Sequence, residues 1–382
     1  MDRSVFLAAC DSYDPAEVDA AVRRCLDRFG GASALVRPGT RVLVKPNLLM
    51  PQRPETATTT HPAVVAAIAR AFAEAGAQVV VAESAGGPYN TPVQRILYRV
   101  CGMEPIAEIP GVSLNGDLSV RETALPEGRT VTSLPIIAPA LDADFVVTAA
   151  KMKTHGFAYY TGAVKNLFGV VPGLTKAKLH ARFPDRAKFN AMLVDICERI
   201  RPGLSIVDGV IGMEGMGPSA GSPKKAGVIV ASLSPYAADL ACARIMGFDP
   251  DRIPVLVEAA ERGLVPDSAD RLEWSGDPLS RFETYFRPAE NKLPGDGMRA
   301  LPRPLRAWIH RRFSPYPLVT PDCAGCGKCA EICPQQVISM HNGHASIRRD
   351  SCIKCYCCHE ICPFQAIDLV SPRRGRPAPG GT

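Results

Sequence analysis

Two cysteine-rich stretches near the C-terminus constrain the fold of that region more than any other feature of the chain. CAGCGKCAEICP begins at Cys323, and CIKCYCCHEICP begins at Cys352. Both have the spacing C-x2-C-x2-C-x3-C-P. Three cysteines so close together can bind three corners of one cubic [4Fe–4S] cluster, while the fourth points away and the next proline turns the chain. The spacing therefore predicts iron–sulfur clusters.

Both stretches resemble the motif of bacterial-type ferredoxins, in which the fourth cysteine of one copy binds the cluster of the other copy. The resemblance predicts two [4Fe–4S] clusters in a small α+β ferredoxin-like domain over residues 319–370. The first cluster would be bound by Cys323, Cys326, Cys329 and Cys362, and the second by Cys352, Cys355, Cys358 and Cys333. Gly325 and Gly327 suit a loop whose backbone amides approach a cluster closely. Cys357, which lies between two predicted ligands, receives no role.

A zinc site and a disulfide framework are the alternatives for such a set of cysteines. Zinc sites use four ligands, commonly as two separated pairs, and two tandem runs of four cysteines fit that pattern poorly. Disulfide frameworks are typical of short secreted chains, whereas this chain has 382 residues. The sequence therefore favours iron–sulfur clusters and, with them, electron transfer.

Length and composition are typical of a globular protein with two or three domains. The chain is 46% hydrophobic and 21% charged, as in soluble proteins. No apolar run is long enough for a membrane-spanning helix. Free thiols and oxygen-sensitive clusters predict a reducing compartment, the cytoplasm.

The net charge of +6 comes from one segment of the chain. Residues 151–190 contain eight Lys or Arg against one acid, Asp185, so this segment carries +7 and the rest of the chain −1. Aromatic residues are sparse there, and the basic segment is short, which argues against nucleic-acid binding. A local basic cluster instead suits an anionic small molecule or an acidic protein partner.

Apolar runs and amphipathic stretches alternate from residue 5 to residue 264. Strands are predicted over residues 5–10, 41–47, 78–83, 144–150, 204–208 and 226–231, and helices over 15–29, 61–75, 92–100, 162–168, 187–200, 235–246 and 253–262. This alternation predicts an α/β fold, with a mainly parallel sheet and helices on both faces.

Composition divides the chain into four parts. Residues 1–264 form the predicted α/β domain, 265–318 a linker rich in Pro and Arg, 319–370 the two-cluster domain, and 371–382 a disordered tail. Within the linker, residues 299–313 contain five arginines and no acid, together with Trp308 and Phe313. This basic strap is predicted to pack its aromatic residues against the body, or to dock a partner or membrane surface.

Polar residues follow the predicted strands at the carboxyl edge of the sheet, where α/β proteins bind ligands. These residues are Lys45, Asn47, Glu83, Ser84, Lys151, Lys153, Thr154, His155, Asp208 and Glu214. In an extended segment the side chains of Lys151, Lys153 and His155 share one face. The repetition of polar residues after several strands predicts a binding site.

Two further motifs add candidate residues. In TGAVKNLFG, Thr161 is predicted to be the N-cap of a helix whose N-terminal amides bind an anion, with Lys165 one turn on and Asn166 beside it. In DGVIGMEGMGP, a Gly-rich loop is predicted to hold Asp208 and Glu214 as acid/base groups, as ligands of a hard metal ion, or as partners that neutralise nearby lysines. Neither motif is a dinucleotide or P-loop fingerprint.

Five motifs together resemble the uncharacterised domain-of-unknown-function family 362. They are VKPNL from Val44, TTTHP from Thr58, KMKTH from Lys151, TGAVKNLFG from Thr161 and DGVIGMEGMGP from Asp208. The resemblance covers residues 5–264 and the ferredoxin-like unit. It implies an iron–sulfur protein with an α/β body and a redox role, and it implies no particular substrate.

The leading hypothesis is an oxidoreductase that relays electrons from an external donor through two [4Fe–4S] clusters to an anionic small molecule. The predicted substrate-binding residues are Lys45, Asn47, Lys151, Lys153, Thr161, Lys165 and Asn166. His155, with Asp208 or Glu214, would handle protons. The main alternative is a non-catalytic electron carrier or accessory subunit, whose basic cluster docks an acidic partner or the ferredoxin-like unit itself. A third hypothesis is a metal- or phosphate-dependent transferase with structural or sensing clusters.

Overall fold

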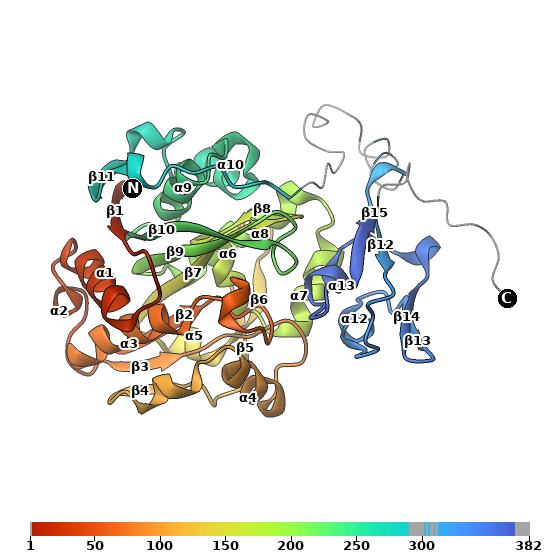
Figure 1. Ribbon diagram of the computed structural model, residues 1–382, viewed down its shortest axis with the longest axis horizontal. Helices are drawn as coiled ribbons and strands as arrows, with labels where there is room; N and C mark the ends of the chain where they lie inside the picture. Colours follow the sequence, from red (N-terminus) through yellow and green to blue (C-terminus); the bar gives the residue numbers. More distant parts are fainter. Residues whose placement is uncertain (1, 290–301, 303–304, 306–308, 310–311, 371–382) are drawn as a thin grey trace.

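A computed structural model describes residues 2–289, 302, 305, 309 and 312–370. The predicted tail and most of the basic strap at residues 299–313 lie outside this range. Figure 1 shows a larger α/β domain and a smaller C-terminal domain beside helix α7 (Gly173–Arg182).

One mixed, mostly parallel sheet forms the centre of the larger domain, as predicted. In spatial order its strands are β11 (Glu273–Gly276), β1 (Ser4–Ala9), β10 (Ser222–Ser232), β9 (Leu204–Glu214), β7 (Phe145–His155), β2 (Arg41–Pro46), β3 (Gln78–Val81) and β4 (Val112–Leu114), and β8 (Tyr159–Thr161) pairs with β7. Within the described residues, only β10 and β8 run antiparallel to their neighbours.

Helices cover both faces of this sheet. One apolar core joins the sheet to α1 (Pro15–Asp27) and α3 (Pro62–Glu74). The other joins it to α8 (Arg186–Ile200), α9 (Pro235–Ile245) and α10 (Pro254–Glu261). Successive strand residues alternate between the two cores: Val42 and Val44 belong to the first and Leu43 to the second. The continuous apolar runs in the sequence follow from this burial on both faces.

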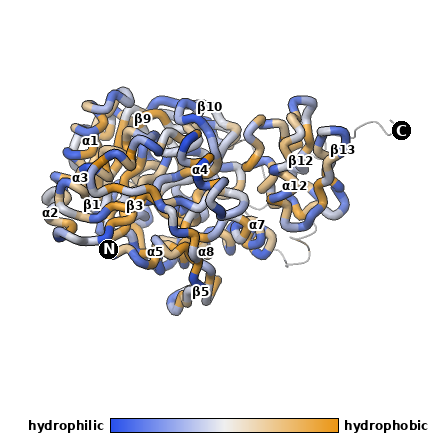
Figure 2. Tube along the Cα trace, turned by 90° about the horizontal axis from the view of Figure 1, so that it is seen from below, coloured by the Kyte–Doolittle hydropathy of each residue, from blue (hydrophilic) through white to orange (hydrophobic). Residues whose placement is uncertain are grey.

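Shorter elements connect these layers. They are α2 (Ala32–Leu35), α4 (Thr91–Val100), α5 (Ala138–Asp142), α6 (Ala163–Asn166), the hairpin β5 (Val120–Ala124) with β6 (Ser133–Ile137), and the 3-10 helices at Pro54–Thr56, Glu104–Glu108, Leu167–Val170, Pro250–Arg252, Ala269–Arg271 and Leu279–Arg281. Strand β5 projects from the body (Figure 2).

The larger domain extends past residue 264, where composition suggests its end. Strand β11 pairs with β1, and the side chains of Phe282 and Phe286 are buried in the core. At least residues 273–286 therefore belong to this domain rather than to a linker. Only four residues long and at the edge of the sheet, β11 lacks the apolar run that would have marked it.

The small domain is built from two similar halves. Its elements are β12 (Tyr316–Val319), α12 (Lys328–Ile332), β13 (Ile338–His341), β14 (His344–Ile347), a 3-10 helix at Arg349–Ser351, α13 (Cys357–Glu360) and β15 (Ile367–Val370). Strands β12 and β15 pair antiparallel, as do β13 and β14.

Among the described residues, none of the helices is both long and apolar enough to span a lipid bilayer.

Candidate functional site

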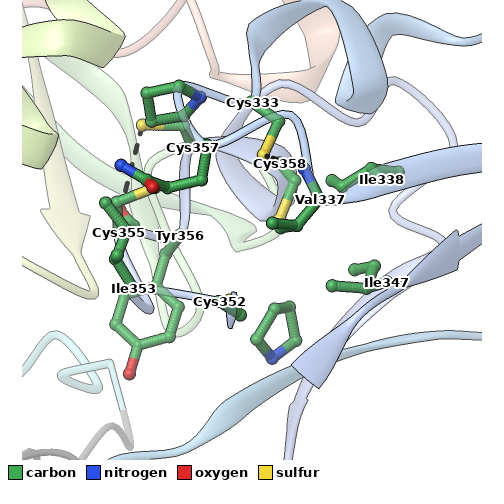
Figure 3. Close-up of a pocket in the computed structure, with 13 residues that line it drawn as sticks. Cys333, Val337, Ile338, Ile347, Cys352, Ile353, Cys355, Tyr356, Cys357 and Cys358 are labelled. Carbon is green, nitrogen blue, oxygen red and sulfur yellow. Dashed lines mark hydrogen bonds between the residues drawn. The ribbon is translucent and has the colours of Figure 1, made fainter. Parts of the chain in front are cut away.

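The eight predicted cluster ligands line two separate cavities in the small domain. Cys333, Cys352, Cys355 and Cys358 line one cavity, and Cys323, Cys326, Cys329 and Cys362 line the other. This grouping, with the fourth cysteine exchanged between halves, is the one that the spacing predicts. Figure 3 shows the first of these cavities, with Ile338 and Ile347 on the side opposite Cys355.

The backbone around both cavities suits a bound cluster. Gly325 and Gly327 have positive φ angles, and so do Lys354 and Tyr356 at the equivalent positions of the second half. A Cβ on Gly325 would lie 2.1 Å from the carbonyl oxygen of Gly343, so only glycine fits there. Backbone N–H groups donate hydrogen bonds to three of the sulfurs. They are those of Val337 to Cys333 Sγ (3.5 Å), Lys354 to Cys352 Sγ (3.4 Å) and Ala366 to Cys362 Sγ (3.3 Å).

A site for a single metal ion is a different arrangement. Across the described part of the chain, no three His, Cys, Asp or Glu side chains are arranged to hold one ion.

The polar residues of the larger domain meet at the switch point of the sheet. From β2 the chain proceeds outward through β3 and β4, whereas from β7 it proceeds in the opposite direction to β9. The carboxyl ends of β2 and β7 therefore flank the switch point, the place at which open α/β sheets bind ligands. Lys45 and Asn47 lie at one side of this switch point, and Lys151, Lys153 and His155 at the other.

Lys45 is part of a closed, buried ion pair. Its Nζ lies 2.6 Å from Glu83 Oε2 and 3.3 Å from Asn166 Oδ1, and the Asn166 amide donates back to the Lys45 carbonyl oxygen (2.8 Å). A Cβ on Gly169 would lie 2.0 Å from Glu83 Oε1, so glycine at 169 permits this close packing. Lys45 and Asn166 thus fix Glu83 at the carboxyl end of β3.

Lys151 and Asp208 form a second closed pair. Lys151 Nζ lies 2.8 Å from Asp208 Oδ2 and 2.8 Å from the Tyr13 hydroxyl, which donates to Asp208 Oδ1 (2.8 Å). The backbone N–H of His61 also donates to Asp208 Oδ2 (3.0 Å), and the His61 ring stacks on Tyr13 with centroids 3.6 Å apart. Tyr13 and His61 were missed because no motif links residue 13 to residue 208.

Asp208 and Glu214 do not form a carboxylate pair beside His155. Both lie within strand β9, so the predicted Gly-rich loop is wrong over residues 208–214. Glu214 accepts hydrogen bonds from Arg287 Nε (2.7 Å) and Arg287 N (3.0 Å). Both carboxylates are therefore occupied by basic partners, which is the neutralising role that the sequence left open.

The short helix α6 does not present free amides to a ligand. Its N-cap is Gly162 rather than Thr161, so the predicted N-cap is wrong. The backbone N–H groups of Ala163 and Val164 donate to the carboxylate of Asp239 (2.6 and 3.0 Å). An internal carboxylate, supplied by α9, thus occupies the position predicted for an external anion.

Within the described residues, no ion pair joins Lys153 or Lys165 to a carboxylate. Lys153 Nζ donates to Asn47 Oδ1 (2.8 Å) and to the Thr58 carbonyl oxygen (2.7 Å). Burial, together with the charges of Lys165 and Lys151, holds the pKa of Lys153 well below its usual value. The pKa of Lys165 is also lowered by burial, and the charge of Glu360 opposes this shift. These two ammonium groups form the uncompensated part of the site.

His155 is a neutral hydrogen-bond donor. Its Nδ1 accepts from the backbone N–H groups of Phe157 (3.0 Å) and Ala158 (3.1 Å), so the ring proton resides on Nε2. Burial and the charge of Lys165 hold the pKa of His155 well below its usual value. Nε2 lies 3.6 Å from Glu360 Oε1 and has no hydrogen-bond partner among the described residues.

Glu360 comes from the small domain, from helix α13. Burial raises its pKa to about 7, and the charges of Lys165 and Lys153 oppose this shift. The Glu360 carbonyl oxygen accepts from Ser219 Oγ (2.7 Å), and the next residue, Ile361, packs against Met50 and Ala177. The small domain is therefore docked on the carboxyl edge of the sheet. Cysteine spacing gives no sign of this contact, and the sequence missed Glu360 for that reason.

Four side chains with hydrogen-bond donors face this region. They are Lys153, Lys165, His155 through Nε2–H, and Thr161, which lies opposite Lys153 in the β7–β8 pairing. Thr161 Oγ1 is buried and has no partner in the described part of the chain. A set of donors with excess positive charge is suited to an oxyanion such as a carboxylate or phosphate.

His180 lies beside the site in a cluster of aromatic rings, and its protonation tests whether this cluster is buried. Its ring stacks on Phe189 with centroids 4.3 Å apart, and burial lowers its pKa from 6.5 to about 3. Below pH 6.5 the unfolded chain binds a proton that the folded chain refuses, so stability falls as pH falls. From pH 7 to pH 5 the unfolding free energy of both proteins should fall. We expect the fall to be about 2 kcal/mol smaller for His180→Leu than for the unmodified protein. Urea unfolding at both pH values measures this, and equal losses would contradict it.

Comparison with known proteins identifies both domains. Residues 42–244, more than half of the chain, match the model of a domain of unknown function, DUF362. The chain belongs to the DUF362 family. In this DUF362 protein, residues 322–367 match the 4Fe-4S dicluster domain. The predicted family and the ferredoxin-type iron–sulfur domain are thus confirmed.

One curated relative covers most of this DUF362 protein. A thylakoid-associated protein of Synechocystis sp. is 34% identical over 323 residues, which are 83% of this chain and 98% of the relative. Solved structures are more distant. The lactate racemase apoprotein of Thermoanaerobacterium thermosaccharolyticum has a TM-score of 0.42 at 14% identity, over 64% of this chain and 57% of that one. A Thermotoga maritima protein has a TM-score of 0.37 at 13% identity, over 61% and 59%.

Proposed function

We propose that this protein is an iron–sulfur oxidoreductase that relays electrons from an external donor through two [4Fe–4S] clusters to an anionic small molecule at the carboxyl edge of the sheet. Each cluster, when bound, supplies one-electron transfer. The observation that carries the proposal is the position of Glu360. It lies two residues after the cluster ligand Cys358, and its carboxylate is 3.6 Å from His155 in the uncompensated site.

The residues of this site have distinct proposed roles. Lys153 and Lys165 bind the oxyanion, Thr161 donates a hydrogen bond to it, and His155 donates a hydrogen bond through Nε2–H. The remaining predicted residues position these groups rather than contact the ligand. Asn47 orients Lys153 (2.8 Å), and the buried pairs of Lys45 with Glu83 and of Lys151 with Asp208 support the strand ends.

The second set of cysteines faces this site. Tyr356 belongs to the main core of the α/β domain, and Cys357, between Cys355 and Cys358, packs in the same cluster as Met50. Cys355 packs against the same cluster, so this half of the small domain contacts the larger domain. Electrons would therefore reach the ligand from the cluster of Cys333, Cys352, Cys355 and Cys358.

Burial of the lysines argues against the electron-carrier alternative in its simplest form. The side chains of Lys45, Lys151 and Lys153 are 0%, 0% and 1% exposed. They cannot form a flat basic face for an acidic partner protein. In the docked arrangement the acidic group that approaches Lys153 and Lys165 is Glu360 of the chain's own small domain.

We propose the cytoplasm as the compartment. None of the fourteen cysteines, all of which lie in the described residues, forms a disulfide, and the eight proposed cluster ligands need a reducing environment. The Synechocystis relative is described as thylakoid-associated. Fractionation of cells into cytoplasm and membranes, followed by immunodetection, tests this proposal, and recovery only with membranes would overturn it.

Replacing Lys153 and Lys165 together by Met tests the oxidoreductase proposal. Without the two ammonium groups, we expect at least about 100-fold slower reoxidation of the reduced clusters by the anionic acceptor. Native mass spectrometry of the anaerobic protein identifies molecules that co-purify, and stopped-flow absorbance with these and with a panel of oxo and unsaturated carboxylates measures the rate.

A matched control uses lysines of the same basic segment. Lys178 and Lys188 are exposed, so Lys178→Met with Lys188→Met removes the same charge without touching the site. This control should reoxidise at the unmodified rate. If both double variants react alike, or if no acceptor reoxidises the unmodified protein, the proposal fails.

A further inference from the structure

The charged groups around the site do not balance. Within the described residues, four lysines lie near the switch point of the sheet: Lys45 and Lys153, which are buried, and Lys165 and Lys176, which are partly exposed. The two carboxylates of the same region are Glu83 and Glu360. Lys151 and Asp208 form a closed pair beside this group and leave no net charge.

Glu83 is shared between two of these lysines. Its Oε2 lies 2.6 Å from Lys45 Nζ, and its Oε1 lies 3.9 Å from Lys176 Nζ. Lys176 also donates to the Ser84 carbonyl oxygen. One carboxylate therefore faces two ammonium groups.

Glu360 is the carboxylate whose charge acts on the other two lysines. Its charge acts on both Lys153 and Lys165, yet its carboxylate accepts no hydrogen bond from either within the described residues. With all of these groups in their ordinary ionised forms, the region carries two more positive than negative charges. Uncompensated charge in a partly buried site is costly, and a bound counter-ion removes that cost.

From this imbalance we propose that the ligand is a small oxyanion with two negative charges, either a dicarboxylate or a phosphate monoester. The proposal rests on the proposed function for the position of the site, and it adds the charge class of the ligand. The donors are Lys153, Lys165, Lys176, His155 through Nε2–H and Thr161. Glu360, carried by the small domain, is an internal anion 3.6 Å from His155 Nε2. Its charge weakens binding of the ligand.

Isothermal titration calorimetry of the oxidised, cluster-loaded protein tests this class without any electron transfer. The probes are propionate, malonate and methyl phosphate, which separate the one-charge from the two-charge anion and the dicarboxylate from the phosphate monoester. At low ionic strength we expect malonate or methyl phosphate to bind at least about tenfold more tightly than propionate. Equal affinity of all three anions would overturn the proposal.

Two variants change the charge of the site in opposite directions. Glu360→Gln adds one positive charge and should raise the preference for the two-charge anion over propionate at least about fivefold. Lys176→Met removes one and should lower this preference by a similar factor. Lys178→Met, at an exposed position of the same helix, should leave the preference unchanged. Preferences that move together in both site variants would overturn the proposal. Thermal unfolding of each variant confirms that it is folded.

The outcomes for the two proposals are distinguishable. Selective binding of malonate or methyl phosphate, without reoxidation of reduced clusters by any acceptor, would sustain the ligand class and reject the oxidoreductase. Reoxidation by an acceptor with one negative charge, without selectivity in calorimetry, would sustain the oxidoreductase and reject the ligand class.

Discussion

Cys358→Ser is expected to lower the iron content of the anaerobically purified protein by about four atoms per chain, which is the content of one [4Fe–4S] cluster. The Cys358 sulfur lines the same cavity as Cys333, Cys352 and Cys355. A hydroxyl is a poor replacement for a thiolate ligand, so this cluster should be lost or unstable while the other persists. Iron and acid-labile sulfide analysis, together with visible absorbance, measures the loss.

Cys357→Ser is the matched control for this prediction. Cys357 is the direct neighbour of Cys358 and also lines the cavity. Its thiol, however, donates a hydrogen bond to the Cys355 carbonyl oxygen (4.0 Å). The equivalent position of the first half is Lys328, so that half contains no cysteine there. Cys357→Ser should keep the full iron content. An equal loss in both variants would make Cys357 a ligand and contradict the assignment from the spacing.

The sequence predicted those parts of the fold that depend on local pattern. Cluster ligation needs cysteines at short fixed intervals, and the two cavities contain the groups of four that the interval rule gives. The buried strands were predicted because burial on both faces requires continuous apolar runs such as Val42 to Val44.

The glycines of DGVIGMEG show why local pattern failed in strand β9. Glycine is typical of loops, yet a Cβ on Gly209 would lie 2.7 Å from Met152 Cε, and one on Gly212 would lie 2.7 Å from the Met152 carbonyl oxygen. These glycines permit close packing of β9 against β7 rather than a turn. The strand therefore continues through Glu214, and Glu214 pairs with Arg287 instead of joining the site.

Of the candidate site, only the residues that the larger domain contributes could be predicted from the sequence. Lys153, Lys165 and His155 were found because they follow the strand predicted over residues 144–150, which the structure extends to His155 as β7, or lie in the adjacent motif. Glu360 could not be found, because its role depends on docking of the small domain through Ile361 and Ser219. Contacts between distant surfaces leave no periodic signal in a single sequence.

The sequence also suggested that more lysines are available to bind a ligand than the structure leaves available. Five candidate lysines form one set by position, but Lys45 and Lys151 each have a buried carboxylate partner. Sequence spacing cannot show which carboxylate reaches which lysine, because Glu83 is 38 residues from Lys45 and Asp208 is 57 residues from Lys151. The structure therefore limits the proposed ligand contacts to lysines that have no carboxylate partner of their own.

Asp208→Ala is expected to lower the unfolding free energy of the α/β domain by about 3–5 kcal/mol, because it leaves the buried Lys151 ammonium without its partner. The Tyr13 hydroxyl and the His61 backbone N–H lose their acceptor at the same time. Urea unfolding followed by circular dichroism, with the clusters oxidised, measures the change. The double change Lys151→Met with Asp208→Leu should recover part of the loss, since no unpaired charge then remains.

Glu74→Ala is the control for a pair in solvent. Glu74 pairs with Arg23 at 2.9 Å, but their side chains are 50% and 45% exposed, so we expect a change of less than about 1 kcal/mol. A loss of several kcal/mol for Asp208→Ala alone would assign this carboxylate to the ion pair that supports the ends of β7 and β9. A loss no larger than that of Glu74→Ala would instead mean that Asp208 is not needed to neutralise Lys151.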